Sequence, residues 1–231
     1  MTELRQTTTA LALAIGATAL LAAGISTALA SVTVYSNDFG SQARYDEIAR
    51  AGGGKRCDRS YRKKSKAMRA KVKVSPTTCS FRPPVQGDKE LPNHEVTVEG
   101  KILKETPKSV RGSAFIEVTV RAGGGNTGYS LRVFPQKQRF EFVRGPDGGD
   151  FPIDGKSDAI KKINERNALR VDATGAKIRA FVNGKEVASV DDGNPGQVAG
   201  TKVRFAIGSL SNKSKDTVGT FKRVAVAVPD P

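Results

Sequence analysis

Beyond residue 30 the chain consists of short runs in which apolar and polar residues alternate with a period of two. This period is typical of a strand that buries one face and exposes the other. In the run at 96–102, three apolar residues fall on one side while Thr97, Glu99 and Lys101 fall on the other. Similar runs lie at 67–74, 114–122, 129–134, 140–142, 203–207 and 221–228. We count about eleven strands separated by turn residues, a spacing that favours a sandwich or barrel.

Two turn signals in the last third of the chain set the expected order of three strands. Thr174-Gly175 and Asn183-Gly184 are each flanked by short β-prone runs. Asn-Gly suits a two-residue hairpin turn, because both residues tolerate the positive φ that the turn requires. The sequence therefore predicts an antiparallel meander of strands at 169–173, 177–182 and 186–190.

This pattern predicts few helices. The one predicted helix spans 157–164, with Ser157 as N-cap and Ile160 and Ile163 directed inward. Residues 45–50 can form a single helical turn. The predicted fold class is all-β: a two-sheet antiparallel jelly-roll sandwich with at most one short helix, in a single domain over 31–231.

The first 30 residues have the pattern of a secretory signal peptide. A basic start precedes an apolar run at 10–23, and Ala28-Leu29-Ala30 gives a cleavage pattern before Ser31. Polar residues interrupt the apolar run, which favours a cleaved leader over a membrane anchor. We expect cleavage between Ala30 and Ser31, and a secreted, extracellular protein that does not span the membrane after cleavage.

The two cysteines, Cys57 and Cys79, both lie in the part that is expected to be exported. In an oxidising compartment, two lone cysteines most simply form a disulfide with each other. A reactive catalytic thiol is the weaker alternative, because nothing in the sequence places the single histidine, His94, near either cysteine. A disulfide across this loop would stabilise the domain by about 3 kcal/mol.

Charge is the compositional feature that points to a partner. The chain has a formal net charge of +15, and ten of the nineteen residues at 55–73 are Lys or Arg. Such a segment attracts polyanions, or it is a solvated face that keeps a sheet edge from pairing with another sheet. Arg69, Lys71 and Lys73 alternate with apolar residues, so a strand would direct all three to one face. The candidate ligand-binding residues are Tyr61, Arg62, Lys63, Lys64, Arg69, Lys71 and Lys73.

The acidic residues show no catalytic pattern. A glycosidase needs two carboxylates about 5 to 9 Å apart, and E-x-D or E-x-E spacing would provide them on one strand, but the chain has no such run. Glu95 and Glu99 would lie about 13 Å apart on a strand. Glu117 has Thr119, not a carboxylate, at the next position on the same face of its strand. A pair formed across strands, for example with Asp147 or Asp150, stays open.

Other motifs are explained by loops and core packing. Gly123, Gly125 and Gly128 have a dinucleotide-binding spacing, but they precede a strand instead of a helix, which indicates a hairpin loop. His94 has no second ligand at a metal-binding spacing, and Asp191-Asp192-Gly193-Asn194 is more simply a polar turn than a calcium loop. We predict no metal, no cofactor and no catalytic residue. Of the tyrosines, Tyr129 is expected in the core, and Tyr61 is the ring expected to be exposed for stacking on a sugar.

The order of elements in the C-terminal half resembles concanavalin A-like jelly rolls. The likeness is carried by the Asn183-Gly184 hairpin, a turn that contains Gly200, the strand at 203–207 and a terminal strand that begins near Phe221. This superfamily includes laminin G-like modules and the related domain of 3-keto-disaccharide hydrolases, and in it the last strand often lies beside the first. The resemblance implies that 224–228 pairs with 32–35, and it implies a fold without implying an activity.

Three functions remain open from the sequence. The favoured one is a secreted, non-catalytic domain that binds extracellular glycans or anionic polymers through the basic face, with acidic polysaccharide or another extracellular polyanion as partner. The second is a glycoside hydrolase-like enzyme, which would need two close carboxylates lining a cleft. The third is a structural or adhesion module, which would expose a large apolar patch. Export excludes intracellular nucleic acid as the partner.

Overall fold

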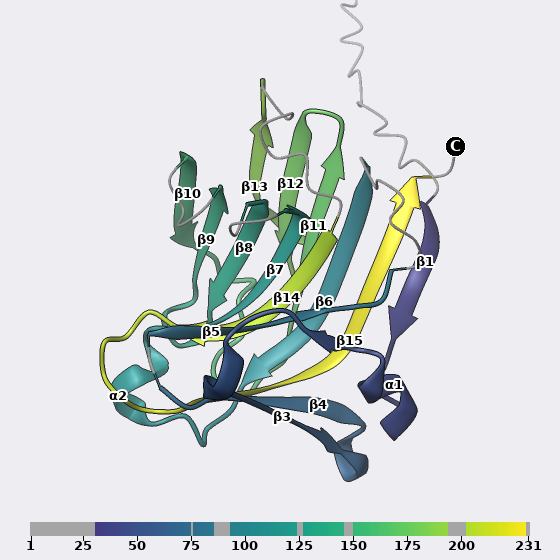
Figure 1. Cartoon of the computed structure of the whole chain (residues 1–231). Coiled ribbons are helices and arrows are strands. Elements are labelled where there is room, and N and C mark those ends of the chain that lie inside the picture. Colours follow the sequence, from purple (N-terminus) through teal and green to yellow (C-terminus); the bar gives the residue numbers. More distant parts are fainter. Residues whose placement is uncertain are drawn as a thin grey trace, which may run out of the picture.

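Two antiparallel sheets pack face to face and enclose one hydrophobic core in the computed structural model (Figure 1). The structure describes residues 31–74, 76–85, 93–123, 127–145, 150–193 and 202–229. The expected signal peptide at 1–30, the turn containing Gly200, and Asp147 lie outside these residues. The predicted all-β, two-sheet sandwich is confirmed.

Sheet A has eight strands in the order β13-β12-β11-β6-β15-β4-β3, with β1 also paired to β15, and sheet B has seven in the order β10-β9-β8-β7-β14-β5-β2. The strands are β1 (Ser31–Asn37), β2 (Ala49–Arg50), β3 (Cys57–Arg62), β4 (Ala67–Val72), β5 (Thr77–Arg82), β6 (His94–Ile102), β7 (Ala114–Ala122), β8 (Tyr129–Phe134), β9 (Arg139–Arg144), β10 (Asp150–Lys156), β11 (Asn167–Thr174), β12 (Lys177–Val182), β13 (Lys185–Asp191), β14 (Lys202–Ser209) and β15 (Thr217–Pro229).

The central meander and the pairing of the two ends of the domain are both confirmed. Val182 pairs with Lys185, so Asn183-Gly184 forms the hairpin tip, with φ angles of 50° and 86°. At the other side of sheet A, β1 runs antiparallel to β15, and Val32 pairs with Val228 (Figure 1). The first and last strands of the domain are therefore neighbours, as the resemblance implied.

The predicted helix at 157–164 is wrong, and this segment forms turns. The Ser157 carbonyl accepts a hydrogen bond from the Ile160 amide at 3.2 Å, and Ile160 is buried as expected. The helix does not continue because the Asn167 side chain bonds the amide and the carbonyl of Lys161, at 2.8 and 3.0 Å. A side chain that binds these backbone groups competes with helical hydrogen bonds.

The helices within the described residues are short and lie elsewhere. Two are α-helical, α1 (Gln42–Asp46) and α2 (Lys108–Arg111), and three are 3-10 turns, η1 (Gly54–Arg56), η2 (Lys63–Ser65) and η3 (Pro135–Lys137). The hydroxyl of Ser41 caps α1 by accepting from the Arg44 amide at 3.2 Å. The helical turn expected at 45–50 thus begins earlier, because the N-cap is at Ser41.

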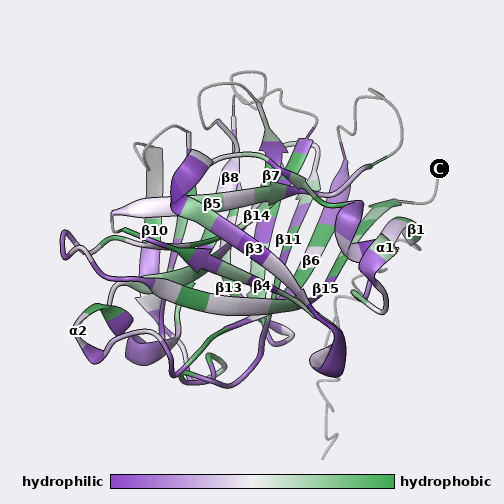
Figure 2. Ribbon diagram, turned by 60° about the horizontal axis from the view of Figure 1, so that its bottom comes forward, coloured by the Kyte–Doolittle hydropathy of each residue, from purple (hydrophilic) through white to green (hydrophobic). Residues whose placement is uncertain are grey.

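The core contains the inward residues of both sheets, and hydrophobic and hydrophilic residues alternate along the strands in Figure 2. Val224 and Val226 of β15 are fully buried and Val228 is half-buried. Three phenylalanines join the sheets at the centre: the Phe205 ring centroid lies 4.8 Å from that of Phe221 and 5.6 Å from that of Phe81. Because the chain has no tryptophan, phenylalanines supply the large side chains at this point of the core.

The predicted disulfide between Cys57 and Cys79 is confirmed, with Cα atoms 5.5 Å apart. Cys57 belongs to β3 of sheet A and Cys79 to β5 of sheet B. The bond therefore links the two sheets covalently at the margin where the basic segment begins.

Candidate functional site

The basic segment forms a hairpin of β3, the turn η2 and β4, which we call the basic hairpin. The alternation predicted for its second strand is confirmed, because Met68, Ala70 and Val72 are buried. Arg69 and Lys71 point to the opposite face and are half-buried. The strand therefore presents its cations on the outer face of sheet A, as the period of two predicts.

Each of the three strand cations has an acidic partner. Arg69 contacts Glu105 at 2.5 Å, Lys71 contacts Asp216 at 2.6 Å and Lys73 contacts Asp58 at 2.9 Å. These carboxylates come from three different segments of the chain, so the sequence does not indicate the pairing. The positive charge of the strand is largely balanced within the fold.

The tip of the basic hairpin is different. Arg62, Lys63 and Lys64 are exposed, and none of them forms an ion pair with any residue that the structure describes. Lys222 of β15 reaches the same turn, where its Nζ donates to the carbonyls of Lys66 at 2.9 Å and Ser65 at 3.5 Å. In Figure 2 the ribbon of this turn has the purple colour of hydrophilic residues. The tip is thus a cluster of uncompensated positive charge.

Tyr61 is not the exposed ring that the sequence predicted. Its hydroxyl donates to the Gly40 carbonyl at 3.1 Å, and its ring lies 6.1 Å from that of Tyr45 in α1. The period of β3 explains the correction, because Cys57, Arg59 and Tyr61 share the inner side of the strand. The guanidinium of Arg59 accordingly lies 4.8 Å from the Tyr45 ring centroid, and both Arg59 and Tyr61 are half-buried.

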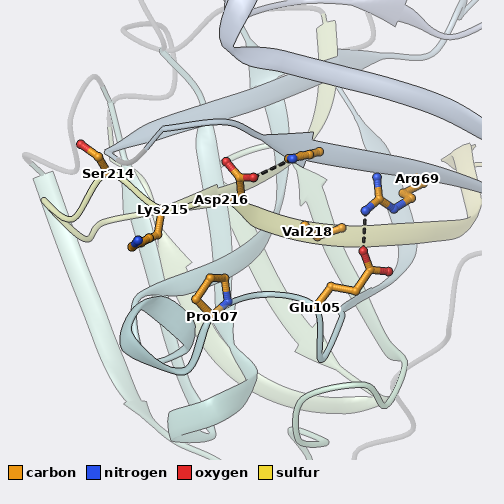
Figure 3. Close-up of a pocket in the computed structure, with 8 residues that line it drawn as sticks. Arg69, Glu105, Pro107, Ser214, Lys215, Asp216 and Val218 are labelled. Atoms are coloured by element: carbon orange, nitrogen blue, oxygen red, sulfur yellow. Dashed lines mark hydrogen bonds and ion pairs between the residues drawn. The ribbon is translucent and has the colours of Figure 1, made fainter.

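A pocket of about 310 Å³ lies beside the paired cations of β4 (Figure 3). Its wall is built by β4, by the loop between β6 and α2, and by the segment that enters β15. The lining residues are Arg69, Lys71, Glu105, Pro107, Ser214, Lys215, Asp216 and Val218. Two of the predicted ligand-binding residues, Arg69 and Lys71, are therefore brought together at a cavity, while Arg62, Lys63 and Lys64 lie at the hairpin tip.

Two close carboxylates, which the sequence did not single out as a pair, lie elsewhere on the outer face of sheet A. Asp172 of β11 pairs in register with Glu95 of β6. Burial raises the pKa of Asp172 to about 6; Arg170 and Arg179 oppose this rise and the Glu95 carboxylate adds to it. The Arg170 guanidinium lies 3.4 Å from Asp172 and 3.5 Å from Glu95.

A row of charged residues crosses the outer face of sheet B and was also missed. Register places Glu117 of β7 beside Arg132 of β8, and Arg132 beside Glu141 of β9. Arg132 contacts Glu117 at 2.5 Å, and Arg139 contacts Glu141 at 2.6 Å. Beneath the row, the arginines cover two buried rings, since Arg132 lies over Phe115 and Arg139 over Phe134.

The remaining candidate groups take part in internal bonds. Tyr129 is in the core, as predicted, and its hydroxyl donates to the buried Asp192 carboxylate, which also accepts from Arg144 at 2.8 Å. His94 is buried, and its Nε2 accepts from the Arg121 amide at 3.3 Å.

Within the described ranges, no group of three or more metal-ligating side chains occurs. None of the helices in those ranges has the length and apolarity to cross a membrane.

Similar proteins are recognised by structure. No protein-family model matches the chain, and no curated protein does. A protein of unknown function with a galectin-like fold from Bacillus subtilis is 12% identical, with a TM-score of 0.59 over 86% of this chain and 97% of that chain. The Crh5 transglycosylase is 12% identical, with a TM-score of 0.59 over 88% and 86% of the two chains. Alginate lyase A1-II′, of polysaccharide lyase family 7, is 14% identical, with a TM-score of 0.53 over 75% and 84%.

The chain has the concanavalin A-like jelly-roll fold. At these identities the similarity shows the architecture and leaves the activity to be argued from the site. The jelly roll carries three polar surfaces: the basic hairpin with its pocket, the carboxylate pair on sheet A and the charged row on sheet B. The sequence signalled the first by its density of cations. The other two depend on which strands are neighbours, which alternation alone does not specify.

Proposed function

We propose that the protein is an exported, non-catalytic module that binds acidic polysaccharide outside the cell through the basic hairpin. The observation that carries this proposal is the exposed tip, where Arg62, Lys63 and Lys64 have no ion-pair partner among the described residues. Uncompensated cations at a protruding turn attract a polyanion and release its counterions on binding. The cations of β4 are each paired with a carboxylate, so the tip supplies the charge that is available to the polymer.

Two further findings support the proposal. The disulfide between Cys57 and Cys79 is of a kind that persists in oxidising compartments, which agrees with export. The proteins of similar fold include alginate lyases, and alginate is itself an acidic polysaccharide. The partner expected for this chain is accordingly an acidic glycan, with released DNA and phospholipid headgroups as the competing polyanions.

The proposal is tested by comparing two triple variants for binding to immobilised alginate and heparin. R62S/K63S/K64S removes three positive charges from the tip, and K161S/K162S/R166S removes three from an exposed loop between β10 and β11. Exposed charge pairs contribute roughly 0.2–1 kcal/mol each, so the tip variant should bind roughly 3- to 150-fold more weakly. The loop variant should bind as the wild type does. Equal losses in both variants would show that net charge alone drives binding, and no loss in either would make the tip a solvated face.

A glycoside hydrolase-like activity is the second candidate, and the carboxylate pair favours it. A carboxyl group that titrates near pH 6 beside a second carboxylate is a possible arrangement for acid–base catalysis. However, the Arg170 guanidinium contacts both carboxylates, at 3.4 Å for Asp172 and 3.5 Å for Glu95, so an arginine forms an ion pair with each of them. We expect no release of reducing ends from a panel of polysaccharides; release that is abolished in Asp172→Asn would establish the enzyme instead.

A further inference from the structure

The first strand of the domain, β1, lies at the margin of sheet A, beside the C-terminal half of β15 (Figure 1). In the part of the chain that the structure describes, β15 is the only strand that pairs with it. Near the end of β1, the Arg44 guanidinium donates to the Ser36 carbonyl, so α1 occupies the edge there. No described strand covers the backbone edge of residues 31–35 on the side away from β15.

The four other strands that end the two sheets each carry a feature that discourages pairing with a further strand. Charged residues, proline and a very short length are such features. In sheet A, β3 and β13 contain three charged residues each. In sheet B, β10 contains Pro152 and three charged residues, and β2 has only two residues. β1 has seven residues and contains no charged residue and no proline, and its one protective feature is a β-bulge between Thr33 and Tyr35.

β1 also exposes apolar side chains. Val32 and Val34 are 49% and 41% exposed, and the third exposed large hydrophobic residue in the described ranges, Leu210, lies in the loop after β14. The segment is uncharged and rich in β-branched residues, a composition that pairs readily with further strands. The edge of β1 is therefore suited to the addition of a strand.

A second copy of the same strand fits this edge. Because β1 has no charge, two copies do not repel each other along its length. Antiparallel pairing about a two-fold axis at Thr33 places Val32 of each copy opposite Val34 of the other, so the exposed valines cover each other. Such cross-strand pairs stabilise a sheet, and a two-fold pairing uses up both open edges.

Charge near β1 favours this pairing although the rest of the chain opposes it. The net charge of +15 makes copies repel each other in general. Residues 31–47, by contrast, hold three acidic residues and one basic residue. Antiparallel pairing places α1 of one copy beside the start of β1 in the other, where the expected cleavage leaves a positive α-ammonium group at Ser31. Opposite charges then meet at both ends of the paired strands.

We propose that two copies of the exported chain pair through their β1 edges, antiparallel and about a two-fold axis at Thr33. Sheet A of one copy then continues into sheet A of the other, and the assembly stops at the dimer because no open β1 edge is left. The inference does not rest on the proposed function. A dimer would carry two basic hairpins, which raises the avidity for any polymer that reaches both.

Sedimentation equilibrium of the exported protein over a range of micromolar concentrations tests the assembly. We expect a monomer–dimer equilibrium with no larger species. Val34→Lys places an unpaired cation in the interface and should weaken the dimer by at least about tenfold. Leu210→Lys adds the same charge at a similarly exposed position away from β1 and should leave the dimer unchanged. A monomer at every concentration, assemblies beyond the dimer, or equal effects of the two substitutions would overturn the inference.

Thr33→Cys tests the register. Directly opposed residues of antiparallel strands have Cα atoms about 4.5–5.5 Å apart, a separation that a disulfide can span. Thr33→Cys should therefore form a disulfide-linked dimer in air, visible on a non-reducing gel, and Leu210→Cys should not. A dimer without this link would overturn the pairing at Thr33, and equal linkage of both variants would mean that the link reports random collisions, which would also overturn it.

Discussion

Asp172 of β11 lies directly opposite Glu95 of β6, so two carboxylates are neighbours on the outer face of sheet A. Burial raises the pKa of Asp172 from 3.8 to about 6, and the Glu95 carboxylate adds to the rise against the opposing effect of Arg170. The folded protein therefore binds a proton at Asp172 in the range where the unfolded chain has released it.

This pair predicts a specific pH dependence of stability. Between about pH 4 and 6 the folded state holds more protons at Asp172 than the unfolded state, so the free energy of unfolding should fall as pH rises through this window. Asp172→Asn cannot ionise and should not show this fall. Relative to the wild type, the variant should gain on the order of 1–3 kcal/mol from pH 4 to pH 7. Urea unfolding at each pH checks this, and parallel profiles for the two proteins would contradict it.

The buried pair of Asp192 and Arg144 should contribute far more to stability than an exposed pair of similar length. Asp192→Ala leaves Arg144 without the carboxylate that it contacts at 2.8 Å and removes the acceptor of the Tyr129 hydroxyl. We expect a loss of about 3–5 kcal/mol in the free energy of unfolding. The control is Asp158→Ala, which breaks the exposed 2.7 Å contact with Lys185 and should be silent within error. Similar costs for the two variants would mean that burial does not decide the effect.

The disulfide should stabilise the jelly roll because it links sheet A to sheet B. The double variant C57S/C79S should lose about 2–5 kcal/mol of unfolding free energy while keeping its strand content by circular dichroism. Mass spectrometry should find no free thiol in the wild-type protein recovered from the medium. Two free thiols, or a double variant as stable as the wild type, would remove the disulfide from the account.

The sequence predicts where the strands and turns of this fold lie better than it predicts which segments contact each other. Alternation and Asn-Gly chemistry locate the meander correctly, because both act within a few residues. The helix predicted at 157–164 does not form, and the reason is local. The Asn167 side chain hydrogen-bonds the backbone amide and carbonyl of Lys161. Asparagine side chains bind local backbone groups in many ways, and a helical period does not report which way is used.

At the candidate site, contacts between distant segments are even harder to predict from the sequence. The density of cations at 55–73 marks the basic hairpin, and the period of two correctly turns Arg69 and Lys71 outward. Their partners Glu105 and Asp216 come from loops far along the chain, so neither the ion pairs nor the pocket between them could be predicted. The charged neighbours of Tyr61 predict an exposed ring, but its position in β3 directs the half-buried side chain inward.

Salt dependence of binding to acidic polysaccharide tests the central claim most directly. The affinity of the wild type for alginate is measured across a series of salt concentrations and compared with that of R62S/K63S/K64S. If the hairpin tip binds the polymer through charge, the logarithm of the association constant falls linearly with the logarithm of salt concentration, and the variant gives a clearly shallower slope. K161S/K162S/R166S should reproduce the wild-type slope. An affinity that does not change with salt, or a tip variant with the wild-type slope, would contradict the account.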